Sequence, residues 1–255
     1  MKKNSFILRL LLFVFVWINL IHTARASHIS GGDISYICVG PNQYIITLNL
    51  YRDCSGITMS TTEFVTLTST CGTTLSLTLD LMNGSNGVEI SQLCPPQLPF
   101  STCAGGTLPG MQHYIYQATV TLTPPCDTWT IFWTTCCRNN TTNLAGGSGD
   151  DIYLQTTLNT ASFPCNNSPI FMNHPIPYVC NGQQVNYNPG VVEPDGDSIA
   201  FTFISAMDGT GNPLPYVGGY SPTQPIPGIT LDPVTGQLTF TPTVNGYFVV
   251  VIQVT

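Results

Sequence analysis

The sequence is poor in charge, and above all in positive charge. Charged residues make up 7% of the 255 residues, whereas an ordinary globular protein has about 25%. After residue 26 there is no lysine, and the only arginines are Arg52 and Arg138. Residues 27–255 therefore hold 2 cations against 13 acids, a formal net charge of 2 − 13 = −11. Such a surface cannot neutralise a phosphate backbone, so nucleic acid is excluded as a partner.

The sequence also lacks long helical patterns, but it does not lack core-forming residues. Hydrophobic residues make up 43% of the chain and aromatic residues 10%, which excludes intrinsic disorder of the usual polar, highly charged kind. Thr, Val, Ile, Tyr and Phe occur in short runs, and Gly, Pro and Asn separate these runs. This pattern predicts an all-β fold.

Only one long apolar run is present, and it lies at the N-terminus. Lysines at residues 2–3 precede an apolar run at 10–18, and Ala-Arg-Ala follows at 24–26. These features predict a signal peptide over 1–26, cleaved after Ala26. The alternative is an uncleaved membrane anchor, for which the run is short. No later segment is apolar enough to span a membrane, so we expect a secreted or outer-cell-surface protein.

Ten cysteines follow the expected cleavage site. Cys-x-x-Cys pairs are absent and the histidines are scattered, which argues against a zinc site. An even number of cysteines in an exported chain predicts disulfides. The expected disulfide cysteines are Cys38, Cys54, Cys71, Cys94, Cys103, Cys126, Cys136, Cys137, Cys165 and Cys180. Their pairing is open, with about 945 connectivities.

Two local expectations concern these cysteines. Cys94 and Cys103 lie in a loop-rich insertion and are expected to close a small loop on themselves. Cys136 and Cys137 are neighbours on a candidate strand, where successive side chains point to opposite faces. We therefore expect these two cysteines to bond to different partners.

Strand candidates fall into two groups, separated by a proline-rich change in composition near residue 163. We predict a disulfide-rich β domain over 27–163 and a second β domain over 164–255. The first group of candidate strands is 33–38, 43–52, 63–69, 73–80, 112–122, 128–135 and 151–158. The second group is 178–181, 184–188, 198–205, 237–241 and 247–255.

Strand phase predicts structural roles for the two arginines. In residues 44–52 the even positions are Tyr, Ile, Leu, Leu and Arg, so Arg52 extends an apolar, core-facing row. A charge there must be paired or reach solvent at the rim. Asp53 points to the other face, so the expected partner is another carboxylate or backbone carbonyls. Arg138 falls on the face opposite Cys137.

The acidic residues are dense at one place, Glu193, Asp195 and Asp197. Alternating carboxylates around a glycine can supply the oxygen ligands that Ca²⁺ prefers. The alternative is a solvated turn that leads into a strand. Calcium is thus the single candidate cofactor.

Five motifs in order, at residues 27–36, 51–54, 136–139, 175–180 and 193–198, make up a series. This series resembles the N-terminal region of large secreted surface proteins of gliding Gram-negative bacteria, which often carry a type IX secretion sorting domain. Residues 228–232, 235–238, 241–242 and 246–250 at the end of the chain are similar to an Ig-like, cadherin-like module. The resemblance implies surface or adhesion roles. The predicted fold class is all-β, with two β-sandwich (Ig-like) domains stapled by disulfides. Because the sequence stops within an expected last strand, we expect a longer gene product.

No catalytic motif is present. Residues 146–150 (Gly-Gly-Ser-Gly-Asp) do not form Gly-x-Ser-x-Gly and indicate a flexible loop instead. We therefore predict a non-catalytic adhesion or scaffold module whose partner is a surface protein or a glycan. The alternative is an extracellular carbohydrate-binding accessory domain or carbohydrate-active enzyme, for which Asp150 and Asp151 are a carboxylate pair without a motif. A third hypothesis is a purely structural stalk.

Overall fold

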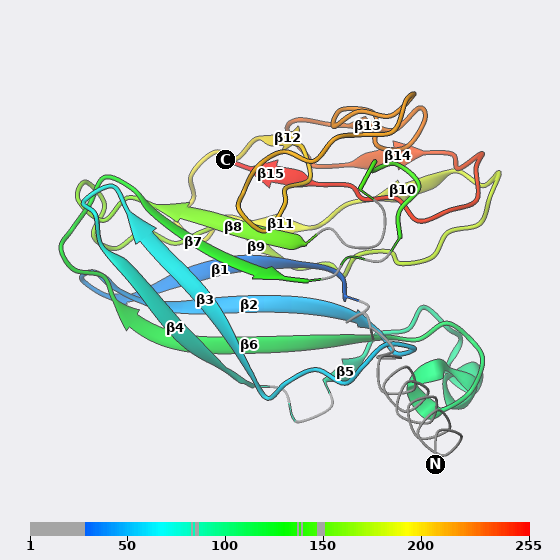
Figure 1. Cartoon of the computed structure of the whole chain (residues 1–255), viewed down its shortest axis with the longest axis horizontal. Coiled ribbons are helices and arrows are strands. Elements are labelled where there is room, and N and C mark those ends of the chain that lie inside the picture. The colour runs from blue at the N-terminus through cyan, green and yellow to red at the C-terminus, as the bar shows by residue number, and fades with distance from the viewer. Residues whose placement is uncertain (1–28, 83, 85–86, 137, 139, 147–150) are drawn as a thin grey trace, which may run out of the picture.

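The computed structural model describes residues 29–82, 84, 87–136, 138, 140–146 and 151–255. The all-β prediction is confirmed, because strands dominate and the only described helices are two short 3-10 turns, η1 (Pro95–Phe100) and η2 (Thr102–Ala104). Among the described residues, no helix has the length and apolar character that a bilayer span requires. Figure 1 shows one large sheet and a second region of short strands beside it.

The large sheet has eight antiparallel strands. The order is β1-β2-β6-β4-β3-β7-β8, and β5 pairs with β6. The bounds are β1 Ile29–Gly40, β2 Gln43–Asp53, β3 Thr62–Ser69, β4 Thr74–Leu81, β5 Val88–Glu89, β6 Met111–Thr121, β7 Trp129–Thr135 and β8 Ile152–Leu158. All seven strand candidates of the first group correspond to one of these strands.

The sheet curls until its two edges approach each other. β4 and β6 pair through only two residue pairs, Asp80 with Gln117 and Leu81 with Tyr116, which makes a corner. At the edges, a Cβ on Gly32 of β1 would lie 2.8 Å from Cδ1 of Leu154 in β8. The Tyr36 hydroxyl of β1 donates to the carbonyl of Thr157 in β8 at 3.1 Å. The result is a near-barrel with one interior.

The interior is filled by the alternating apolar rows of the strands. In β2 the even residues from Tyr44 to Leu50 are fully buried, while their odd neighbours are partly exposed. Side chains of period two on a curled sheet pack inward from every strand. The largest fully buried side chains are Trp129, Trp133, Tyr44, Tyr114, Tyr116, Ile46, Leu48, Leu50, Leu67, Leu79, Met111 and Leu122.

The second region consists of much shorter strands. They are β9 Ile170–Phe171, β10 Val185–Tyr187, β11 Val191–Val192, β12 Phe201–Phe203, β13 Thr230–Leu231, β14 Leu238–Phe240 and β15 Ile252–Val254. They form three small sheets, β10-β14-β13, β11-β9 and β12-β15. Their small core contains Ile226, Ile229 and Leu238. The strand predicted over 178–181 is wrong: prolines at 175 and 177 precede it, and residues 178–180 have no strand pairing.

The connection between β7 and β8 reaches into the second region, as the green loop beside β10 in Figure 1 shows. Asn143 is fully buried. Its amide Nδ2 donates to the carbonyls of Pro225 and Val249 at 3.1 and 2.8 Å. Its Oδ1 accepts from the amide of Val249 at 3.0 Å, and its carbonyl accepts from Val217. Part of the first predicted domain therefore completes the packing of the second.

Candidate functional site

Three disulfides have both cysteines among the described residues, and they hold the large sheet to its surrounding loops. They join Cys38 to Cys165, Cys54 to Cys103 and Cys71 to Cys126. Each joins segments distant in sequence, 127, 49 and 55 residues apart. Disulfides of this kind indicate folding in an oxidising compartment.

The expected loop closure between Cys94 and Cys103 is wrong. Gly110 lies between the segments of Cys54 and Cys103: its carbonyl accepts from the Cys54 amide at 3.0 Å, and its amide donates to the Thr102 hydroxyl at 3.0 Å. This arrangement brings Cys103 to Cys54, and Cys94 stays an exposed free thiol.

Cys180, also expected in a disulfide, is likewise free and exposed. Cys136 is disulfide-bonded. Cys137 lies outside the described residues, so the prediction that Cys136 and Cys137 bond to different partners stays a prediction.

Arg52 lies on the buried row of β2, with only 7% of its surface exposed. Its Nε donates to the carbonyl of Ile57, and its Nη2 donates to the carbonyl of Gly56. Its Nη1 donates to Oε1 of Gln112 in β6 at 2.6 Å. The guanidinium is thus paired with carbonyls of the loop that follows β2, one of the two kinds of partner that strand phase allows.

Arg138 ties the end of β7 to the start of β8. Its Nη2 donates to the carbonyl of Asp151 at 3.0 Å. Its predicted relation to Cys137 lies outside the described residues, as do Asp150 and residues 147–149 of the glycine loop.

The acidic cluster is used for local hydrogen bonds. The Asp195 carboxylate accepts from the amide and from the side-chain Nδ2 of Asn167, both at 2.7 Å. Glu193 accepts from the amide of Asp197 at 2.8 Å. Among the described residues, no group of three or more His, Cys, Asp or Glu side chains is arranged to hold a metal ion. A calcium role for Glu193, Asp195 and Asp197 stays a prediction.

A polar cluster that sequence reasoning missed lies on the outer face of β1, β2 and β6. The amide of Asn49 donates to Oδ1 of Asp33 at 2.9 Å, and its Oδ1 lies 2.9 Å from Nε2 of His113. The His113 ring stacks on Tyr51, with centroids 4.8 Å apart. His174 of the second region meets the edge of this stack, 5.0 Å from His113. Only the register that sets Tyr51 opposite His113 reveals this cluster, and one sequence does not supply that register.

The environment of this cluster shifts two pKa values in opposite directions. Burial raises the pKa of Asp33 to about 6, although the Asn49 hydrogen bond opposes the shift. Burial, together with the neighbouring His174, lowers the pKa of His113 to about 4. In both residues the environment disfavours the charged form.

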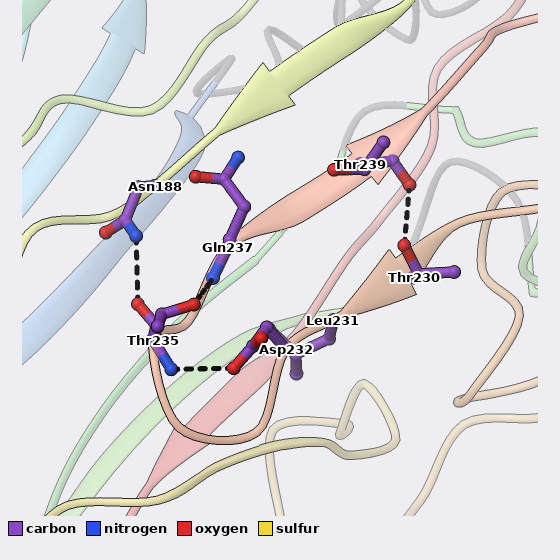
Figure 2. Close-up of a pocket in the computed structure, with 7 residues that line it drawn as sticks. All are labelled: Asn188, Thr230, Leu231, Asp232, Thr235, Gln237 and Thr239. Atoms are coloured by element: carbon purple, nitrogen blue, oxygen red, sulfur yellow. Dashed lines mark hydrogen bonds between the residues drawn. The ribbon is translucent and has the colours of Figure 1, made fainter.

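The second region carries an open groove of about 580 Å³, drawn in Figure 2. Asn188, Thr230, Leu231, Asp232, Thr235, Gln237 and Thr239 line it. The lining polar groups are already occupied: Asp232 accepts from the amides of Val234 and Thr235 at 2.9 and 2.8 Å. These bonds hold the pKa of Asp232 below its usual range. None of the seven lining residues is aromatic, so the groove offers no stacking platform for a sugar ring.

Comparison with known proteins gives no match, whether to protein-family models, to curated proteins or to solved structures.

Proposed function

We propose that residues 27–255 form a secreted or cell-surface binding and scaffold module without catalytic activity, made of a disulfide-stapled near-barrel and a second, sandwich-like part. The finer assignments of an Ig-like second part, a signal peptide over 1–26 and a gliding-type surface protein belong to this proposal. They rest on the motif series of the sequence.

One observation carries the proposal: Arg52, Asp195 and Asp232 all use their charged groups to hold loops in place. Arg52 binds carbonyls of the loop after β2, Asp232 caps a turn, and Asp195 fixes the segment at Asn167. A glycosidase needs two unengaged carboxyl groups on either side of a substrate cleft. A rigid display surface needs loops fixed to a frame, which supports a binding role.

Incubation of the secreted protein with insoluble polysaccharides and with intact bacterial cells tests the proposal. We expect adsorption to cells without release of reducing ends from any of the polysaccharides. Release of reducing ends that scales with protein concentration would refute the non-catalytic assignment and favour the carbohydrate-active enzyme. Adsorption to a polysaccharide alone would favour the accessory-domain alternative.

Calcium binding by the same module is tested by measuring the melting temperature of the whole chain with and without calcium. If Glu193, Asp195 and Asp197 bind Ca²⁺, millimolar calcium raises the melting temperature, and Asp195→Asn abolishes the rise because it removes one charged ligand. Asp208→Asn, at an exposed turn elsewhere in the second region, is the control. An unchanged melting temperature in the unmodified protein removes calcium from the proposal.

A further inference from the structure

We propose that Asp33 and His113 are a charge-compensated pair that makes the contact between the outer face of the sheet and the second region independent of pH from acid to neutral conditions. The proposal stands on the polar cluster described above and does not depend on the proposed function.

The contact is built from one row of β2 side chains. Asn49, Tyr51 and Asp53 alternate with the buried row and point away from the interior. Tyr51 meets His174 at a centroid distance of 6.0 Å, and Asp53 accepts from the hydroxyl of Tyr178 at 3.1 Å. These outward-facing β2 side chains therefore contact the second region through one aromatic contact and one hydrogen bond.

The second region holds His174 in place through its neighbour. Asn173 donates from its amide to the carbonyl of Pro189 at 3.0 Å and from Nδ2 to the carbonyl of Asn188 at 3.0 Å. The Tyr187 hydroxyl donates to the carbonyl of Asn173 at 3.2 Å. His174 is thus presented by a fixed segment.

Asn49 joins Asp33 and His113 into one unit. Its Nδ2 donates to Asp33, so its Oδ1 faces His113 and can only accept a hydrogen bond. The imidazole must therefore donate from Nε2, which a neutral ring does in one tautomer. This geometry is compatible with a neutral His113 and with an Asp33 that is either ionised or protonated on Oδ2, the oxygen that Asn49 does not contact.

Each packed element contributes known neighbours to the pair. β1 supplies Asp33, β2 supplies Tyr51, and β5 places apolar Val88 opposite His113. The segment before β10 supplies His174, and the charge of Asp33 is felt by Tyr187 of β10. Arg52 lies on the buried row, so it does not face the pair.

Between about pH 4 and 6, closing the contact causes no net uptake or release of protons. When the contact opens between about pH 4 and 6, His113 takes up one proton and Asp33 releases one. The two linkages have opposite sign. The Asp33 contribution to stability is present at acid pH and is lost as the pH rises through about 6. The His113 contribution is present above its ordinary value of 6.5 and is lost as the pH falls through about 4.

The test compares the whole chain with Asp33→Asn, His113→Gln and the double variant by melting temperature between pH 4 and 7.5. Relative to the unmodified protein, Asp33→Asn gains roughly 5 °C at neutral pH, and this gain disappears by pH 4. His113→Gln shows the opposite slope, with its most favourable difference at pH 4. The melting temperature of the double variant changes with pH in parallel with that of the unmodified protein. Both linkages are absent in the variant, and they cancel in the unmodified protein.

Hydrogen exchange at residues 170–174 shows whether the contact itself opens: protection should be retained at pH 5 in the unmodified protein and be equal or higher at pH 5 in Asp33→Asn, which takes up no proton when the contact closes. If the variants do not fold, a titration of the His113 ring by NMR decides. A midpoint near 4 supports the pair. A midpoint near 6.5, or single variants whose pH slopes match the unmodified protein, overturns it.

Discussion

At the scale of single residues, Arg52 and Arg138 serve the frame of the molecule. Arg52 replaces what would be the last apolar residue of the β2 row, and it satisfies carbonyls that the tight loop after β2 leaves without strand partners. Arg suits this position because its planar fork donates in several directions at once. Alternation placed Arg52 on the buried row, but no pattern identifies carbonyls four and five residues ahead as its partners.

We predict that Arg52→Gln lowers the melting temperature by roughly 5–10 °C, because the carbonyls of Gly56 and Ile57 lose a charged donor at a cost of about 2–3 kcal/mol. Differential scanning calorimetry measures the change. Arg52→Lys keeps the charge but loses the forked guanidinium, so its melting temperature should lie between those of the unmodified protein and Arg52→Gln. A Gln variant with an unchanged melting temperature would show that the loop holds its shape without this side chain.

At the scale of elements, the segment after the large sheet seals the free edge of β1. Ser168 exchanges hydrogen bonds with the backbone of Tyr36, and Asn167 accepts from the amide of Cys38 at 2.8 Å. The disulfide from Cys38 to Cys165 fastens this segment. An edge strand covered in this way cannot pair with another chain.

The strands of the large sheet could be predicted because each is long enough to show a clear alternation of buried and exposed residues. The pairing of the cysteines could not, since it depends on which loops meet around the curled sheet. Cys103 illustrates this: Cys94 is nearer in sequence, yet Gly110 brings Cys103 to Cys54.

We predict that the double variant Cys38→Ser/Cys165→Ser loses about 4 kcal/mol of unfolding free energy, since the closed loop is long and its cross-link restricts the unfolded chain. Guanidinium denaturation of the whole chain measures this loss. Cys94→Ser, at an exposed free thiol, is the matched control and should change stability by less than about 0.5 kcal/mol. Equal stability of both variants would contradict the role given to the Cys38–Cys165 bond.

At the scale of the whole molecule, the two predicted domains are interlocked. A ring contact at Tyr51 and a hydrogen bond at Asp53 join them, and the loop around Asn143 enters the second region. The second region was harder to predict because its strands are only two or three residues long and part of its packing comes from residues 141–146. A boundary drawn at 163 from composition cannot show that dependence.

Asn143 provides the sharpest test of this interlock. We predict that Asn143→Ala destabilises the protein by about 3 kcal/mol, because three side-chain hydrogen bonds disappear and the carbonyls of Pro225 and Val249 lose a donor. Hydrogen exchange should rise at residues 216–217 and 247–249, while β2 and β6 keep their protection. Asn140→Ala, at an exposed position of the same loop, should leave exchange unchanged.

If the second region were independent of the loop, Asn143→Ala would expose no more of it than the Asn140 variant does. Increased exchange confined to the second region would instead show that residues of the first predicted domain stabilise the second. Because Val249 both donates to and accepts from the Asn143 side chain, the segment at 247–249 should respond most strongly. The interlock thus predicts which part of the second region opens first when the loop is weakened.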